Sequence, residues 1–151
     1  MNALTMLSRD HDHVKRLLRQ LESTTERGVK TRRELYGRIR EALTVHESIE
    51  EEIFYPALRK HPRAKGIVLE GIEEHNVVDQ LMAELDDLDP RDETWGPKAK
   101  VMKENIEHHI EEEEGPMFAS ARRVFERSDL TELGRLMGER RAQLEASKTA
   151  G

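Results

Sequence analysis

The chain has 151 residues, of which 36% are hydrophobic and 37% are charged, and its formal net charge is −6. This length is enough for one domain with a buried core, and the composition suits long helices that each bury one stripe. Because the sequence contains no cysteine, it excludes disulfides, iron–sulfur clusters, zinc ribbons and thiol nucleophiles. Basic residues are interspersed with acidic ones and form no basic block, which argues against nucleic acid as a partner.

No apolar run approaches the roughly 18 residues of a membrane span, and the N-terminus lacks the apolar region of a secretory signal. We therefore expect a cytoplasmic protein that has no membrane partner and is a monomer or a weak homodimer. Any metal bound by this chain must be held by histidines and carboxylates.

Apolar residues recur at spacings of three and four almost throughout, which predicts helices and no strands. The expected helices cover residues 4–21, about 31–58, 68–88 and about 97–125, and a shorter fifth helix follows Ser128 and Asp129. Four long helices with short connections predict an all-α, antiparallel, up-down-up-down four-helix bundle. We assign residues 1–127 to the bundle and residues 128–151 to a short C-terminal helix and tail that pack on it or extend from it.

The chain repeats itself once. The segment "DHDHVKRLLRQL" at residues 10–21 matches "EHNVVDQLMAEL" at residues 74–85, with an offset of 64. Likewise "HESIEEEIFYPALR", which starts at His46, matches "HIEEEEGPMFASAR", which starts at His109, with an offset of 63. The domain is thus predicted to consist of two helical hairpins of one design.

Each hairpin places ionisable residues on an otherwise apolar stripe. Residues four apart lie one above the other on a helix, so each His-x-x-x-Glu pair directs both side chains to one point. A single histidine on such a face is more often a satisfied core residue than a ligand. Burying several ionisable groups without a compensating cation is costly, however, and six of them favour a site with two metal ions. The six residues on the stripes are His11, His46, Glu50, His75, His109 and Glu113.

The residue types restrict the metal. Imidazole and carboxylate without thiolate suit iron, manganese or zinc. The ferritin-like di-iron pattern Glu-x-x-His is absent, and Glu50 stands where the zinc-protease pattern His-Glu-x-x-His requires its second histidine.

The remaining pattern resembles the hemerythrin, or HHE cation-binding, family over about residues 4–125. The resemblance implies an up-down-up-down bundle that holds two iron ions, with Glu50 and Glu113 bridging them. It carries over position by position to the six residues on the stripes. The adjacent His13 and His108 lie off these stripes and are not expected to bind metal.

One departure concerns the third helix. The oxygen carriers of the family have His-x-x-x-His there, but the position four before His75 is Gly71, so the fifth histidine is missing. Glu47 is the expected replacement, because similar domains read His-Glu-x-x-Glu on the second helix. The alternative is that Glu47 is a solvated acid. Tyr36 and Tyr55 are the only tyrosines, and their spacing places neither of them at the metal.

Four histidines and three carboxylates contain more anionic ligands than a carrier site, and anionic oxygen donors favour ferric iron. We therefore expect a non-haem di-iron protein that reacts with dioxygen or hydrogen peroxide, with catalase-like turnover as one version. A reversible oxygen-binding module, or an iron- or oxygen-sensing module without turnover, is the alternative. A structural bundle with fortuitous histidines is a third reading.

Overall fold

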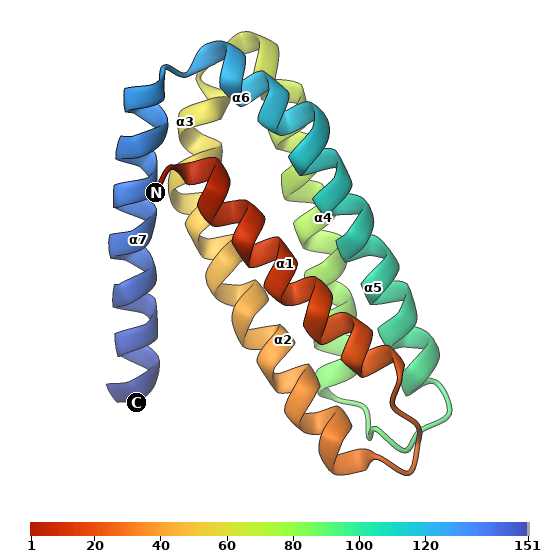
Figure 1. Cartoon of the computed structure of the whole chain (residues 1–151). Coiled ribbons are helices and arrows are strands. Elements are labelled where there is room, and N and C mark those ends of the chain that lie inside the picture. Colours follow the sequence, from red (N-terminus) through yellow and green to blue (C-terminus); the bar gives the residue numbers. More distant parts are fainter. Residues whose placement is uncertain (151) are drawn as a thin grey trace.

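The computed structural model describes the backbone of residues 1–150 and the side chains of residues 1–148. Within this range the protein is entirely helical, and the predicted four-helix bundle with a fifth helix is confirmed (Figure 1). The elements are α1 (Ala3–Glu22), α2 (Val29–Ile49), η1 (Glu50–Phe54), α3 (Tyr55–Arg59), α4 (Pro62–Asp86), α5 (Trp95–Glu112), η2 (Glu113–Met117), α6 (Phe118–Val124) and α7 (Arg127–Ala150).

Two of the four bundle helices are composite. The second consists of α2, η1 and α3 in succession, and the fourth consists of α5, η2 and α6. The segments η1 and η2 are π-helical, and each begins at the glutamate of a His-x-x-x-Glu pair. In both, the amide five residues beyond that glutamate donates to the glutamate carbonyl: Tyr55 to Glu50, and Phe118 to Glu113. Such wide turns occur often at functional sites.

Two helices differ from their expected extents. The third begins at Pro62 rather than near Val68, because a proline suits the first turn of a helix, where no amide donor is needed. The fifth is not short: α7 has 24 residues, against 20 in α1. Its length follows from its packing, since Leu130, Leu133 and Met137 are all buried.

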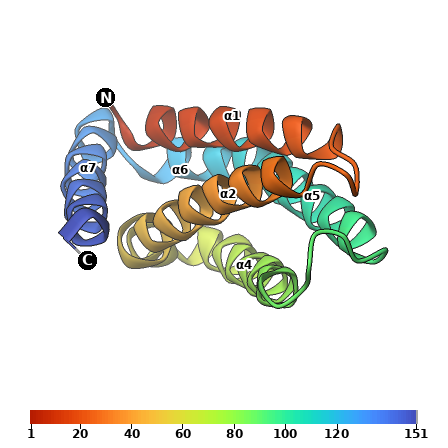
Figure 2. The same ribbon diagram turned by 90° about the horizontal axis from the view of Figure 1, so that it is seen from below.

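Helix α7 lies across one side of the bundle. It contacts α1, α2 and η1, which belong to the first hairpin (Figures 1 and 2). Gly134 permits the N-terminal residues to pass close to α7, because a Cβ atom there would overlap the carbonyl oxygen of Met1. The first hairpin therefore has a covering helix, which sets it apart from the second hairpin, formed by α4, α5, η2 and α6.

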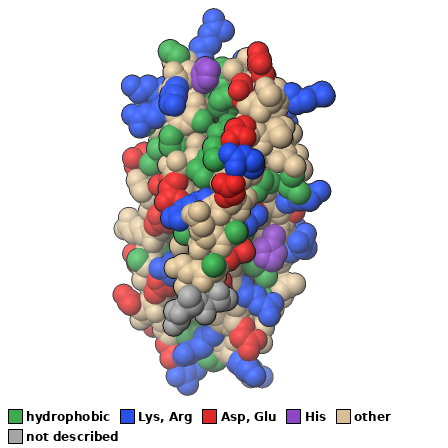
Figure 3. Space-filling view, turned by 90° about the vertical axis from the view of Figure 1, so that its left-hand side faces the viewer, with side chains coloured by type: hydrophobic (Ala, Val, Ile, Leu, Met, Phe, Trp, Pro, Cys, Tyr) green, Lys and Arg blue, Asp and Glu red, His purple; other side chains and the backbone are tan. Residues whose placement is uncertain are grey.

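Two apolar clusters fill the bundle, one toward each end. The cluster that includes Leu7, Tyr55 and Met137 lies toward α7, and the cluster that includes Val14, Val78 and Ile106 lies toward the two hairpin loops. The ionisable residues of the stripes lie between these clusters. Among the described residues no helix is long and apolar enough to cross a membrane. The face that carries α7 mixes acidic and basic side chains without a separate basic area (Figure 3).

Candidate metal centre

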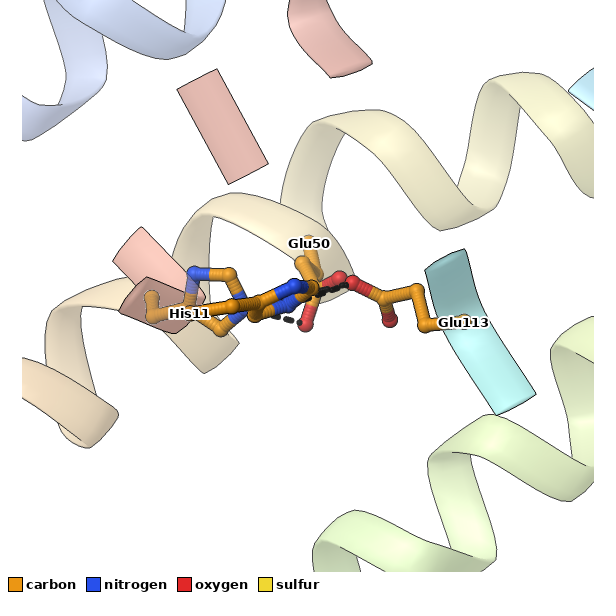
Figure 4. A group of neighbouring side chains, drawn as sticks. His11, Glu50 and Glu113 are labelled. Carbon is orange, nitrogen blue, oxygen red and sulfur yellow. Dashed lines mark ion pairs between the residues drawn. The ribbon is translucent and has the colours of Figure 1, made fainter. Parts of the chain in front are cut away.

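The six predicted side chains meet in the middle of the bundle. All six are buried, and Glu50 and Glu113 have no exposed surface. The carboxylates of Glu50 and Glu113 point toward one another and toward the imidazole of His11 (Figure 4). Every histidine directs its Nε2 atom to a carboxylate oxygen at 3.0–3.2 Å: His11 and His109 to Glu113, and His46 and His75 to Glu50.

These donors fall into two sets that share both glutamates. One set contains His11, His46, Glu50 and Glu113, and the other contains His75, His109, Glu50 and Glu113. Within each set the ligand atoms lie within 4.8 Å of one another. Each set takes its histidines from one hairpin, so both glutamates stand at the boundary between the two repeats.

Several of these inner atoms lack a hydrogen bond. They are His11 Nε2, His46 Nε2, both oxygens of Glu50 and Glu113 Oε1. They approach other ligand atoms closely but make no hydrogen bonds with them, and they belong to the two groups of ligand atoms described above. A buried polar atom without a partner costs free energy, and a cation in each group would satisfy all of them. The residues present therefore fit a metal group of the expected kind.

The outer nitrogens of the four histidines are occupied. His11 Nδ1 lies 2.6 Å from Glu114, His46 Nδ1 lies 2.8 Å from Asp10, His109 Nδ1 lies 2.7 Å from Glu74, and His75 Nδ1 lies 3.3 Å from Glu51. A carboxylate on Nδ1 fixes the imidazole tautomer with Nε2 free to coordinate, and it makes that nitrogen more basic.

This outer layer repeats with the sequence. Asp10 corresponds to Glu74 with the offset of 64, and Glu51 corresponds to Glu114 with the offset of 63. The sequence analysis did not assign these four acids a role. The sequence does contain a pattern that could have identified them. In each hairpin one acid directly precedes the lone histidine, and another directly follows the glutamate of the His-x-x-x-Glu pair.

The electrostatics of the metal-free centre show what a cation replaces. Burial lowers the pKa of His109, but hydrogen bonds with Glu113 and Glu74 outweigh burial and raise it to about 10. Burial raises the pKa of Glu113, but the close contacts with Glu50, His109 and His11 hold this pKa well below its usual range. Burial also lowers the pKa values of His11 and His46, but hydrogen bonds and the charges of neighbouring carboxylates outweigh burial and raise both. Protons on these three histidines thus compensate the buried carboxylates when no cation does.

Glu47 is buried but lies outside both four-residue sets. It groups instead with Glu51 and His75. Burial and a hydrogen bond with Asp79 raise the pKa of Glu47 to about 10, so it carries a proton at neutral pH in the metal-free protein. The reading of Glu47 as a solvated acid is wrong, because its side chain is buried; its role as a ligand stays a prediction.

Tyr55 is a residue of the centre that the sequence did not place. Its hydroxyl donates to Glu113 Oε2 at 2.6 Å and lies 3.4 Å from Nε2 of both His75 and His109. Burial, followed by the charges of Glu50 and Glu113, raises its pKa. A Cβ atom on Gly71 would lie 3.2 Å from the Tyr55 hydroxyl oxygen. The phenol thus occupies the space beside the position of the missing fifth histidine.

Tyr36, His13 and His108 lie away from the centre. Tyr36 donates to the carbonyl of Met82 and to Asp86. His13 is exposed, and His108 is exposed and lies 3.6 Å from Glu74. The preference for His11 over His13 and for His109 over His108 agrees with their positions.

The chain matches the sequence profile described as the hemerythrin HHE cation binding domain over residues 2–121. It belongs to this family. Its fold is similar to a crystal structure of a hemerythrin HHE cation binding domain-containing protein from Mycobacterium kansasii, with a TM-score of 0.86 and 26% identity, over 97% of this chain and 89% of that one.

A longer relative also matches. The chain is 25% identical over 122 residues to a protein named DNA nickase from Nostoc sp. strain PCC 7120. The match covers 81% of this chain but only 34% of that protein, so the chain spans about a third of its length. A segment similar to this chain therefore also occurs as one part of a longer protein.

Proposed function

We propose that this protein is a non-haem di-iron protein that reacts with hydrogen peroxide or dioxygen, with catalase-like disproportionation of peroxide as its activity. The observation that supports this most is the pair of four-residue sets that share Glu50 and Glu113 and leave their inner atoms without hydrogen bonds. Four imidazoles and bridging carboxylates suit iron. Two irons would take up two electrons from one peroxide, which loses two protons and leaves as dioxygen, and would return the two electrons to a second peroxide, which takes up the two protons and becomes two waters.

The space beside the centre suits a very small substrate. A cavity of about 20 Å³ adjoins all four histidines. This is close to the space that one water molecule needs. Its other walls are mostly apolar, including Val14, Leu43, Val78 and Ile106. A cavity of this size suits peroxide or dioxygen better than an organic substrate.

Two residues beside the centre, Glu47 and Tyr55, can donate a proton or serve as an additional oxygen ligand. Glu47 lines the same cavity and holds a proton on its carboxyl group at neutral pH. We infer that it serves the reaction as an acid at the substrate position, if it does not bind metal as the family resemblance implies. Tyr55 approaches the centre beside Gly71, among the residues of the other apolar cluster. Its hydroxyl holds the orientation of Glu113 and is the second candidate for the additional oxygen ligand.

The test begins with metal content. Protein purified after growth with sufficient iron should contain about two irons per chain, and its diferric form should absorb in the near ultraviolet. Peroxide added to this protein should release dioxygen at half the molar amount of peroxide consumed. The matched control is Glu50→Ala, which removes one shared carboxylate. Absence of iron would contradict the di-iron proposal and favour a structural bundle whose histidines bind no metal. Release of dioxygen no faster than in Glu50→Ala would exclude catalase-like turnover.

The alternative function is a sensing or oxygen-binding module. It is favoured by the Nostoc relative, in which a matching domain makes up only about a third of a longer protein. Stable, reversible oxygenation of the diferrous protein without peroxide turnover would support the alternative. Rapid turnover of peroxide would contradict it.

A further inference from the structure

Arg141 of α7 connects the fifth helix to the metal centre. Its guanidinium donates to Oδ2 of Asp10, and the same oxygen lies 2.8 Å from Nδ1 of His46. On the inner side of that ring, Nε2 of His46 lies 3.0 Å from Glu50. Arg141 is therefore two contacts away from an inner ligand atom, although it is 131 residues from Asp10 in the sequence.

Among the described side chains, the corresponding acid of the second hairpin has no guanidinium partner. Glu74 lies 2.7 Å from Nδ1 of His109, and its other ion-pair partner in the described part of the chain is the exposed His108, at 3.6 Å. Helix α7 covers α1 and α2, so its arginine reaches Asp10 and not Glu74. One outer carboxylate is thus held by a guanidinium, and its repeat counterpart is not.

The surroundings of Asp10 give this contact a consequence. Asp10 lines a cavity of about 340 Å³ between α1, α2 and α7, together with Arg141 and His46. The Asp10 side chain is 19% exposed, so without a second partner it could turn from His46 toward this space. Arg141 donates from the α7 side and keeps the carboxylate on His46 Nδ1.

We propose that Arg141 is a positioning residue for the metal ion held by His11 and His46, and that it makes the two metal positions unequal. The proposal rests on the proposed metal centre. A carboxylate fixed on Nδ1 orients the imidazole and strengthens its bond to a metal, and the loss of such partners typically lowers metal affinity about 10- to 100-fold. Arg141 acts through Asp10 and not on the ring itself, so we expect a smaller effect, confined to one of the two ions.

The experiment compares neighbouring arginines of α7. Arg140→Gln is the matched control, because Arg140 bonds to the exposed Glu52 and makes no contact with an outer carboxylate of the centre. The full-length protein is loaded with iron and mixed with excess chelator, and the release of iron is followed over time. In Arg141→Gln one equivalent should leave about 3- to 10-fold faster, below the range seen when an outer carboxylate itself is lost. The second equivalent should leave at the wild-type rate.

A second measurement excludes a merely structural effect. In protein loaded with zinc as a diamagnetic probe, exchange of the His46 Nδ1 proton with solvent should accelerate in Arg141→Gln, while that of His109 should not change. Arg141→Lys keeps the positive charge but replaces the planar guanidinium by a single ammonium group. It should therefore release iron at a rate between those of the wild-type protein and Arg141→Gln. If Arg141→Gln does not fold, Arg141→Lys still provides the comparison.

The outcomes separate the two proposals. Wild-type protein without bound metal would overturn both the metal centre and the role of Arg141. Two bound ions that leave Arg141→Gln and Arg140→Gln at equal rates would overturn the role of Arg141 alone. Equal acceleration of both equivalents would show general loosening of the bundle and would also overturn it.

Discussion

The two hairpins carry the same inner and outer ligand pattern but differ in what surrounds it. Around the histidines of the first hairpin, α7 supplies Arg141 to Asp10, and Phe118 from the second hairpin stacks over His11 with ring centroids 6.3 Å apart. Around the histidines of the second hairpin, the repeat counterpart of Phe118 is Tyr55 from the first hairpin, which stacks over His75 at 5.4 Å and adds a hydroxyl. The repeat builds a symmetric set of donors, and single substitutions beside it make the two halves chemically different.

Gly71, which lies against Tyr55, also differs from its repeat counterpart. Gly71 corresponds to Leu7 with the offset of 64, and Leu7 is fully buried. A leucine side chain at position 71 would collide with the tyrosine ring, since even a Cβ atom would lie 3.2 Å from its hydroxyl oxygen. Gly71 and Tyr55 therefore depend on each other, whereas their counterparts Leu7 and Phe118 are both members of the same apolar cluster.

The largest effect is expected where the hairpins share a residue. Glu113→Gln should lower metal affinity at least about 100-fold, because loss of the more distant outer partners alone costs about 10- to 100-fold. Glu50→Gln should do the same, since each glutamate contacts one histidine from each hairpin. Metal content after dialysis measures this. Retention of two ions per chain by either variant would contradict a shared, bridging role.

The outer carboxylates should differ between the hairpins. Glu114→Gln should lower metal affinity about 10-fold or more, and Glu51→Gln should have a smaller effect. The contact of Glu114 with His11 is 2.6 Å, whereas that of Glu51 with His75 is 3.3 Å and its carboxylate is 40% exposed. Competition with a chelator of known affinity measures both. An equal or larger loss in Glu51→Gln would show that the contact distance does not set the effect.

Tyr55→Phe makes the surroundings of His75 resemble those of His11. It removes the hydroxyl that donates to buried Glu113, so the free energy of unfolding of the metal-free protein should fall by about 1–3 kcal/mol. Urea denaturation measures this. The matched control is Tyr36→Phe. The hydroxyl of Tyr36 donates to Asp86 at the surface, so its removal should lower the free energy of unfolding by less. If the two variants are equally stable, the buried hydrogen bond of Tyr55 contributes no more to stability than the surface hydrogen bond of Tyr36.

The smallest effect concerns Glu47, whose repeat counterpart is the apolar Ile110. Its pKa is raised to about 10 in the folded protein, so between pH 5 and 10 the folded state binds more protons than the unfolded state. Stability of the metal-free protein should therefore fall as the pH rises through this range, and the raised pKa of His109 acts in the same direction above pH 6.5. Glutamine does not titrate, so the stability of Glu47→Gln should fall less steeply over this pH range than that of the wild-type protein.

Glu47→Gln also separates the two roles of this residue. If Glu47 serves as an acid, the variant should keep two metal ions and turn over peroxide more slowly. If it is a ligand, metal content should fall. Urea denaturation at several pH values and metal analysis of the same samples give both answers. An unchanged pH dependence of stability would show that Glu47 is not protonated in the folded protein.

Much of the centre followed from the sequence because helical spacing fixes which side chains share a face. His46 and Glu50 are four residues apart, and so are His109 and Glu113, so each pair had to point to one place. What the spacing could not place was Tyr55. Five residues on a regular α-helix turn the side chain roughly 140° away from Glu50. The π-helical segment changes this, so that Phe54 and Tyr55 are buried while Ile53 is only partly buried.

The sequence by itself determined the bundle, its internal repeat and the six inward side chains, because these depend on periodicity and on local geometry. The tertiary structure decided everything that depends on contacts between distant segments. It brought Asp10 to His46 and Glu74 to His109, placed the Tyr55 phenol against Gly71, and laid α7 across the first hairpin so that Arg141 reaches Asp10. No spacing rule encodes such contacts, since they arise only when helices pack and bring residues far apart in the chain within a few ångströms.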